Sequence, residues 1–125
     1  MGLTGLQACI DMEATPKKVR IYITIDRKRP FKEWLKSLKD IKAVTKIERR
    51  LERLEKGNEG DVRSVGNGVS ELRIDYGPGY RVYFGQLGAK IVLLLCGGDK
   101  STQAQDLKKA QEYWSDYRRR EDANK

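Results

Sequence analysis

The chain has 125 residues and a formal net charge of +8, from 26 lysines and arginines against 18 aspartates and glutamates. This length suits one domain with a modest core, and the charge favours a polyanionic partner such as nucleic acid or the ribosome, with a merely solvated basic surface as an equal alternative. There is no histidine, there are two cysteines, and no apolar stretch is long enough for a membrane span. We therefore expect a cytoplasmic protein that needs no membrane, metal or other cofactor.

The first half of the chain predicts one strand and two helices. Residues 1–17 show neither periodicity nor helix caps, and we expect a partly disordered leader there. Residues 19–25 (VRIYITI) alternate apolar and polar side chains, which is typical of a half-buried strand. Pro30 then begins a short helix with apolar side chains at helical spacing, and a second helix is expected at residues 41–56, ended by Gly57.

Five basic residues of the second helix form a stripe opposite its apolar face. At about 100° per residue, their spacing places them on one side of the helix. We call them the basic stripe: Lys42, Lys46, Arg49, Arg53 and Lys56. A solvated face flanked by glutamates is the simpler interpretation, and docking of RNA phosphates is the functional one.

The second half of the chain predicts three strands and a last helix. After a polar loop at residues 58–67, strands are expected at 69–75, 80–85 and 90–96. The last strand (KIVLLLC) is apolar at nearly every position, which indicates a central strand covered on both faces. Gly97 and Gly98 are expected to end it, and Thr102 with Gln105 forms a capping box for the last helix.

The order of these elements predicts the fold class. Strand, helix, helix, three strands and helix indicate an α+β domain at residues 18–118, in which the helices pack on a curved, mainly antiparallel, four-stranded sheet. Two helices are N-terminal to the hairpin strands and one is C-terminal. Residues 119–125 are expected to form a charged tail that frays.

Residues 71–84 (ELRIDYGPGYRVYF) form a predicted hairpin with an arginine at the matching position of each arm, Arg73 and Arg81. Because side chains alternate along a strand, its apolar positions face one side and its polar positions face the other. The set expected in the core is Leu72, Ile74, Val82 and Phe84. The set expected outside the core is Glu71, Arg73, Arg81 and Tyr83.

The two arginines should then have a compensating partner, because like charges opposite each other on a sheet cost stability. That partner is either an internal carboxylate, Glu71 or Asp75, or a bound anion. Lys100 follows the neighbouring strand after a glycine pair, so three cations are expected on one concave face. Such a group suits a phosphodiester, whose transition state carries extra negative charge. Tyr83 is expected either to stack on an RNA base or to belong to the core.

Three segments, ELRIDYGPGYRVYF, LLLCGGDKSTQ and DLKKAQEYW, occur in this order and resemble the RelE/ParE toxin superfamily, in particular its HigB-like, phage-associated addiction module killer proteins. The likeness covers about residues 18–117 and implies a RelE-like fold. It also implies a type II toxin that cleaves messenger RNA in the ribosomal A site without a metal, by attack of the 2′-hydroxyl on the adjacent phosphate. On this resemblance the catalytic residues are Arg73, Arg81 and Lys100, and the partners are the ribosome, its mRNA and a helix-turn-helix antitoxin.

The chain also departs from these relatives. It has Glu71 on a strand where RelE has lysines, no histidine, and only Gln103 or Asp106 where RelE has a tyrosine on its final helix. The general base therefore stays open between Lys100 and a carboxylate such as Asp99. ParE-type relatives keep the fold but inhibit DNA gyrase, so a non-enzymatic gyrase inhibitor is the alternative function, and a catalytically dead regulatory module is a third.

Overall fold

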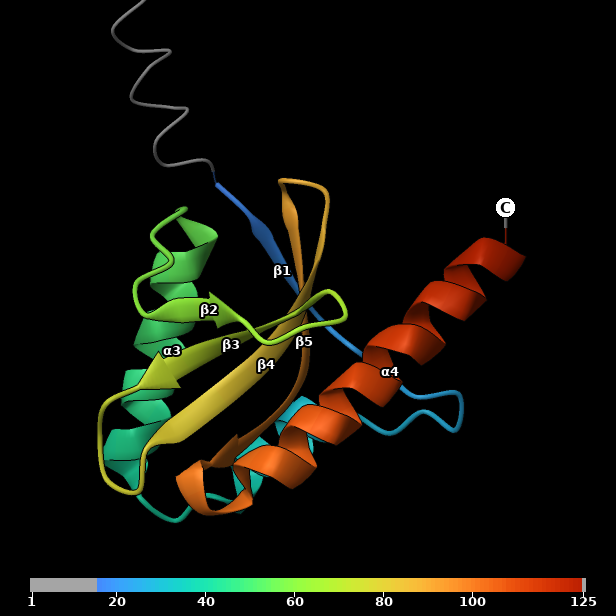
Figure 1. Cartoon of the computed structure of the whole chain (residues 1–125). Helices are drawn as coiled ribbons and strands as arrows, with labels where there is room; N and C mark the ends of the chain where they lie inside the picture. The colour runs from blue at the N-terminus through green and yellow to red at the C-terminus, as the bar shows by residue number, and fades with distance from the viewer. Residues whose placement is uncertain (1–15, 125) are drawn as a thin grey trace, which may run out of the picture.

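A five-stranded sheet organises residues 16–124, which are the part of the chain described by the computed structural model (Figure 1). The strand order is β1-β5-β4-β3-β2, with β1 parallel to β5 and the other neighbours antiparallel. The strands are β1 (Lys18–Ile21), β2 (Val62–Ser64), β3 (Val69–Ile74), β4 (Tyr80–Leu87) and β5 (Ile91–Asp99). The helices are α2 (Pro30–Ser37), α3 (Ile41–Glu55), a 3₁₀ turn η1 (Lys100–Thr102) and α4 (Gln103–Ala123).

Helices cover both faces of this sheet, so the domain has two apolar layers. Side chains of α2 and α3 pack against one face, which includes the four apolar hairpin residues Leu72, Ile74, Val82 and Phe84, as the alternation predicted. Side chains of α4 pack against the other face, over Val69, Tyr83, Leu93 and Leu95. The predicted α+β class and the covering of β5 on both faces are confirmed, whereas β5 is second in the sheet and β4 is its middle strand.

The strands differ from the prediction in number and length. The sheet has five strands where four were expected, because β2 lies inside the predicted loop 58–67 and pairs with β3. The first strand ends at Ile21, and beyond it Ile23 and Ile25 are exposed. Gly97 and Gly98 do not end β5 but belong to it. A Cβ atom at Gly97 would overlap the ring of Trp34 from α2, so this glycine admits an indole against the sheet.

Capping residues determine where α3 begins and ends. The Asp40 carboxylate accepts hydrogen bonds from the backbone N–H groups of Lys42 and Ala43, at 3.0 and 3.3 Å. At the other end Gly57 has φ of 91°, and its N–H donates to the Leu54 carbonyl at 3.0 Å. The predicted end of this helix at Gly57 is confirmed.

The start of α4 differs from the predicted capping box. Thr102 makes no side-chain cap bond to α4, and its hydroxyl donates to the Asp106 carboxylate instead. The capping box that does form belongs to the 3₁₀ turn, between Asp99 and Thr102. This turn places Lys100 directly after β5, beside the end of the β3–β4 hairpin.

The described residues reach beyond both predicted ends of the domain, residues 18 and 118. The predicted leader lies outside the described residues except for its last two, of which Lys17 donates its backbone N–H to the Glu55 carbonyl at 2.7 Å. The sequence prediction ended the domain at residue 118, whereas α4 continues to Ala123. No helix within residues 16–124 is both long and apolar enough to cross a membrane.

Candidate functional site

A cavity of about 450 Å³ opens where the β3–β4 turn meets η1. The register of the hairpin pairs Arg73 with Arg81, and η1 brings Lys100 beside them. All three cations named from the sequence line this cavity, together with the carboxylates Asp61 and Asp75. Ile74, Gly77, Pro78, Gly79 and Tyr80 complete the lining. The cavity thus collects three positive and two negative side chains from four segments of the chain.

Gly79 allows the cations to approach the turn. Its φ of 80° lies in the left-handed region, and a Cβ atom there would come within 3.4 Å of Arg81 Nη1 and 3.6 Å of Lys100 Cβ. The Gly79 carbonyl accepts a hydrogen bond from Arg81 Nη1 at 2.8 Å. The glycine-rich turn therefore forms the wall against which the guanidinium of Arg81 lies.

Arg81 is buried, in contrast to the outward position expected from the hairpin alternation. Only 5% of the residue is exposed, because α4 covers the face of the sheet that we expected outside the core. Its Nε lies 3.6 Å from Glu71 Oε2. The internal carboxylate considered from the sequence is thus the partner of this arginine.

Arg73 and Lys100 are more accessible than Arg81. The side chain of Arg73 is half-buried and that of Lys100 is exposed, and no ion pair joins either of them to another residue of the range 16–124. The backbone carbonyl of Arg73 accepts a hydrogen bond from Arg50 Nη1 of α3 at 2.5 Å. The positive charges that a ligand meets most directly are therefore those of Arg73 and Lys100.

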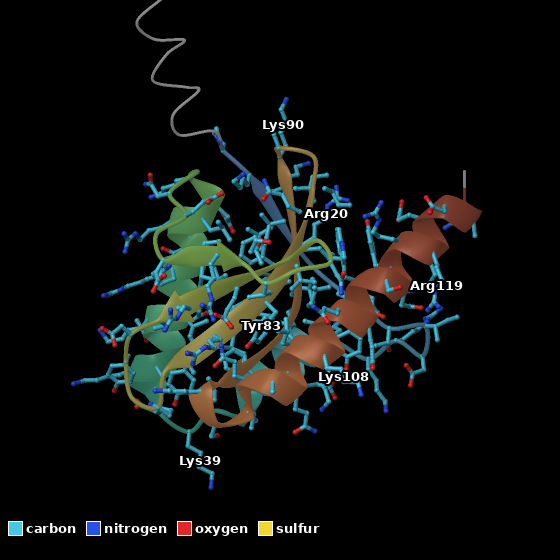
Figure 2. All side chains as sticks on the ribbon, viewed as in Figure 1. Arg20, Lys39, Tyr83, Lys90, Lys108 and Arg119 are labelled. Atoms are coloured by element: carbon cyan, nitrogen blue, oxygen red, sulfur yellow. The ribbon has the colours of Figure 1, made fainter. Side chains whose placement is uncertain are left out.

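Tyr83 does not reach the surface. It is fully buried between the sheet and α4 (Figure 2), and among residues 16–124 its hydroxyl makes no hydrogen bond. Burial and the negative charge of Glu71 raise the pKa of Tyr83 above its ordinary value. Of the two expectations for this residue, the structure favours the core position and does not present the ring to RNA.

The basic stripe of α3 is exposed along its whole length, at Lys42, Lys46, Arg49, Arg53 and Lys56. Lys46 Nζ lies over the Tyr76 ring, 5.2 Å from its centroid, and the Tyr76 hydroxyl donates to Asp40 Oδ2 at 2.9 Å. Because Tyr76 belongs to the β3–β4 turn, the stripe begins close to the cavity. The sequence interpretation did not include Tyr76, since an aromatic residue in a turn gives no sign of its partner.

Asp99, one candidate for the general base, is held in the 3₁₀ turn. Its carboxylate accepts hydrogen bonds from the Ser101 backbone N–H at 2.8 Å and the Ser101 hydroxyl at 2.5 Å. The Ser101 hydroxyl bond is the main cause that lowers the pKa of Asp99, and a lowered pKa makes a weaker base. Asp99 is also not among the residues that line the cavity, whereas Asp61 and Asp75 are.

Several residues around the site were not predicted. Arg63 and Asp61 lie in the segment taken for a loop, and the three-residue strand β2 is too short for its alternation to be seen. Arg50 follows the basic stripe in sequence, yet it donates to the carbonyls of Arg73 and Glu59, and burial lowers its pKa. Within residues 16–124 no group of three metal-ligating side chains lies close enough to hold an ion.

Comparison with known proteins places this chain in a family. Residues 33–113 match the model of the Phage derived protein Gp49-like (DUF891) family, which belongs to the RelE/HigB-like group of toxin-antitoxin toxins. An uncharacterized protein of Haemophilus influenzae (strain ATCC 51907 / DSM 11121 / KW20 / Rd) is 54% identical over 80 residues, which are 64% of this chain and 81% of that protein. Because toxins of this group act as one half of a pair, the family implies an antitoxin partner. The chain therefore belongs to the Gp49-like phage-derived protein family, within the RelE/HigB-like toxins of toxin-antitoxin systems.

Proposed function

We propose that this protein is a toxin that cleaves messenger RNA on the ribosome, and that the cavity at the β3–β4 turn is its active site. The observation that carries the proposal is the convergence of Arg73, Arg81 and Lys100 on that cavity. Two guanidinium groups and an ammonium group stabilise a phosphodiester whose negative charge grows in the transition state. Membership of a toxin family supports the same interpretation.

The reaction is an internal transfer of the phosphate. The 2′-oxygen bonds to the adjacent phosphorus, the bond from phosphorus to the 5′-oxygen breaks, and the products are a 2′,3′-cyclic phosphate and a 5′-hydroxyl. Arg81 holds the scissile phosphate and Arg73 assists it. Lys100 gives a proton to the leaving 5′-oxygen, and Asp61 and Asp75 are the lining carboxylates that can accept the proton of the 2′-hydroxyl.

The ribosome supplies what this cavity lacks. Three cations without a histidine catalyse the cleavage of flexible RNA poorly. A message whose 2′-oxygen is held in line for attack reacts more easily. Such positioning can lower a barrier by roughly 7 to 11 kcal/mol. In this proposal the basic stripe of α3 contacts ribosomal RNA and brings the neighbouring cavity to the message.

The antitoxin is proposed to be a small helix-turn-helix protein encoded beside this chain. Its binding would block or distort the cationic cavity, so the isolated toxin should arrest growth and the pair should be tolerated. Co-expression with the neighbouring reading frame, followed by purification through a tag on one partner, tests this. Failure of the two proteins to co-purify, or growth arrest that persists in the pair, would count against this partner.

The function is tested by adding purified protein to ribosomes that carry a defined message and, separately, to DNA gyrase with plasmid. We expect cleavage of the ribosome-bound message, little cleavage of naked RNA and unchanged supercoiling. Lys100→Ala should slow cleavage roughly 100-fold or more, since a charge-stabilising donor is lost. The matched control is Lys90→Ala, which removes an exposed lysine from the β4–β5 turn (Figure 2). Intact message together with inhibited supercoiling would replace this proposal by the gyrase inhibitor.

A further inference from the structure

A fully buried carboxylate stands behind the active-site cavity. Glu71 of β3 has none of its surface exposed, and it does not line the cavity. Its Oε1 accepts a hydrogen bond from Arg63 Nε of β2 at 3.1 Å, and its Oε2 accepts one from Gln103 Nε2 of α4 at 3.1 Å. Oε2 also lies 3.6 Å from Arg81 Nε of β4. Three different elements therefore converge on one buried carboxylate.

This burial requires an explanation, because a charge removed from water is costly unless it is paired and hydrogen-bonded. The Gln103 amide and the Arg63 guanidinium would satisfy the carboxylate without Arg81. The third partner, Arg81, is the only one of the three that lines the cavity. The network is therefore connected to the site through this arginine.

The contacts of Arg81 fix the direction of its guanidinium. Nη1 donates to the Gly79 carbonyl at 2.8 Å, and Nε faces Glu71 Oε2 at 3.6 Å as an ion pair without a hydrogen bond. The hydrogen bond at Nη1 and the charge of Glu71 at Nε together restrict the orientation of the guanidinium, and in this orientation Arg81 lines the cavity. The group formed by Glu71, Arg63 and Arg81 keeps a net positive charge, since one carboxylate faces two guanidinium groups.

We propose that Glu71 is a positioning residue that aims Arg81 at the scissile phosphate, and that Gln103 and Arg63 in turn hold Glu71. This inference rests on the proposed function, because it assigns a role within that site. It gives the buried carboxylate a purpose that the stability of the sheet does not require. If Arg81 had no catalytic role, two apolar side chains in place of Glu71 and Arg81 would stabilise the fold equally well.

The test is single-turnover cleavage of a ribosome-bound message by Glu71→Gln, which keeps the size of the side chain and removes its charge. We expect the maximal rate to fall roughly 100-fold, as for a misplaced catalytic group, with the protein concentration at half-maximal rate nearly unchanged. The matched control, Glu112→Gln, removes an exposed carboxylate of α4 and should cleave like the unmodified protein. An unchanged maximal rate in Glu71→Gln would overturn the proposal.

A double-mutant cycle separates aiming from simple stabilisation. Glu71→Gln should cost no further activity in a chain that already carries Arg81→Gln, because its effect passes through that arginine. Losses that multiply in the double variant would overturn the proposal. If Glu71→Gln alone does not fold, Gln103→Met replaces it in the cycle, with a loss of a few-fold that must likewise vanish beside Arg81→Gln.

A second measurement does not depend on catalysis. In protein labelled with nitrogen-15 arginine, the Nε–H resonance of Arg81 is followed by NMR while inorganic phosphate is added. We expect phosphate to shift this resonance in the unmodified protein and to bind roughly ten-fold more weakly to Glu71→Gln. Equal phosphate affinity in the two would overturn the aiming role. If the unmodified protein binds phosphate but cleaves no message, the proposed function fails while the aiming of Arg81 stands.

Discussion

The two arginines of the hairpin are paired in register yet have different environments. Arg81 is buried against Glu71, whereas Arg73 is half-buried and lines the cavity without an ion pair among residues 16–124. Two like charges opposite each other on a sheet cost stability, and here the adjacent carboxylate offsets the cost. Arg81 therefore serves the fold as well as the site, and Arg73 is available to the site alone.

This difference predicts unequal effects on stability. Arg81→Ala should lower the free energy of unfolding by about 3 kcal/mol, the lower end of the range for breaking a buried pair, because Arg63 and Gln103 still hold Glu71. Arg73→Ala should change it by about 0.5 kcal/mol or less, as for a surface position. Urea unfolding of both variants measures this. Equal losses would show that the two arginines are equivalent in the fold.

The sequence predicted which residues share a side of the hairpin but not what covers that side. Alternation is a local property, and it placed Glu71, Arg73, Arg81 and Tyr83 together correctly. Their burial depends on α4, which begins twenty residues after Tyr83 and packs back over the sheet. Non-local packing of this kind leaves no signal in the local sequence. We therefore expected an exposed charged face where the structure has a buried network.

At the scale of elements, α4 is fastened to the segment that follows β1 by one group of polar contacts. The Tyr22 hydroxyl donates to Asp116 Oδ2 at 2.5 Å, and Arg120 Nη2 forms an ion pair with the same oxygen at 2.9 Å. Arg120 Nη2 also donates to the Ile23 carbonyl at 2.7 Å. These contacts hold the C-terminal half of the long helix against the segment that follows β1.

The contact group should depend on pH in a defined direction. The Tyr22 hydrogen bond and then the charge of Arg120 lower the pKa of Asp116 below its ordinary value. The stabilisation is therefore present above the unfolded-state pKa of about 4 and is lost as the pH falls through the lower folded-state value. Hydrogen exchange of α4 amides between about pH 5 and pH 3 should show earlier opening of its C-terminal half.

The control for this prediction is Asp116→Asn. It removes the titrating carboxylate, so the C-terminal half of α4 should be less protected from exchange at pH 6, and its protection should lose most of its further dependence on acid. An unmodified chain whose α4 amides keep the same protection, relative to the intrinsic exchange rate at each pH, would contradict the account.

The element boundaries that sequence predicted poorly have related causes. Glycines usually end strands, but Gly97 lies within β5 because the indole of Trp34 occupies the space of a side chain. The contact between Gly97 and this ring from α2 is a tertiary contact, so the sequence around Gly97 does not reveal it. The helix α3 was predicted well because its two signals, the apolar spacing and Gly57, lie within it or beside it, although its cap Asp40 was not named from the sequence.

In the whole molecule two groups of positive charges, the cavity and the basic stripe, adjoin at the β3–β4 turn. The cavity lies on one side of this turn, and the basic stripe begins on the other, where Lys46 meets Tyr76. The five stripe residues are exposed, so they are available to a phosphate backbone without a change of fold. In the proposed function, the stripe docks on ribosomal RNA and the cavity then acts on a nearby message.

Docking through the stripe predicts a dependence on salt. Lys42→Gln, Arg49→Gln and Arg53→Gln together should weaken ribosome binding, and the slope of log affinity against log salt should become smaller by about 2 to 3, since three phosphate contacts are lost. Thermal stability should not change, because the three side chains are exposed. A matched triple variant changes exposed lysines elsewhere: Lys32→Gln, Lys90→Gln and Lys108→Gln. Equal salt slopes in the two variants would argue against docking through the stripe.

The chemical ends of the cleaved message test the central claim most directly. Ribosomes stalled on a defined message are treated with the purified protein, and both fragments are analysed by mass spectrometry. Attack by the 2′-hydroxyl predicts a 5′-hydroxyl on the downstream fragment and a 2′,3′-cyclic phosphate, or the 3′-phosphate derived from it, on the upstream one. A 5′-phosphate with a 3′-hydroxyl, or a message that stays intact, would contradict the claim that Arg73, Arg81 and Lys100 form a ribonuclease site of this kind.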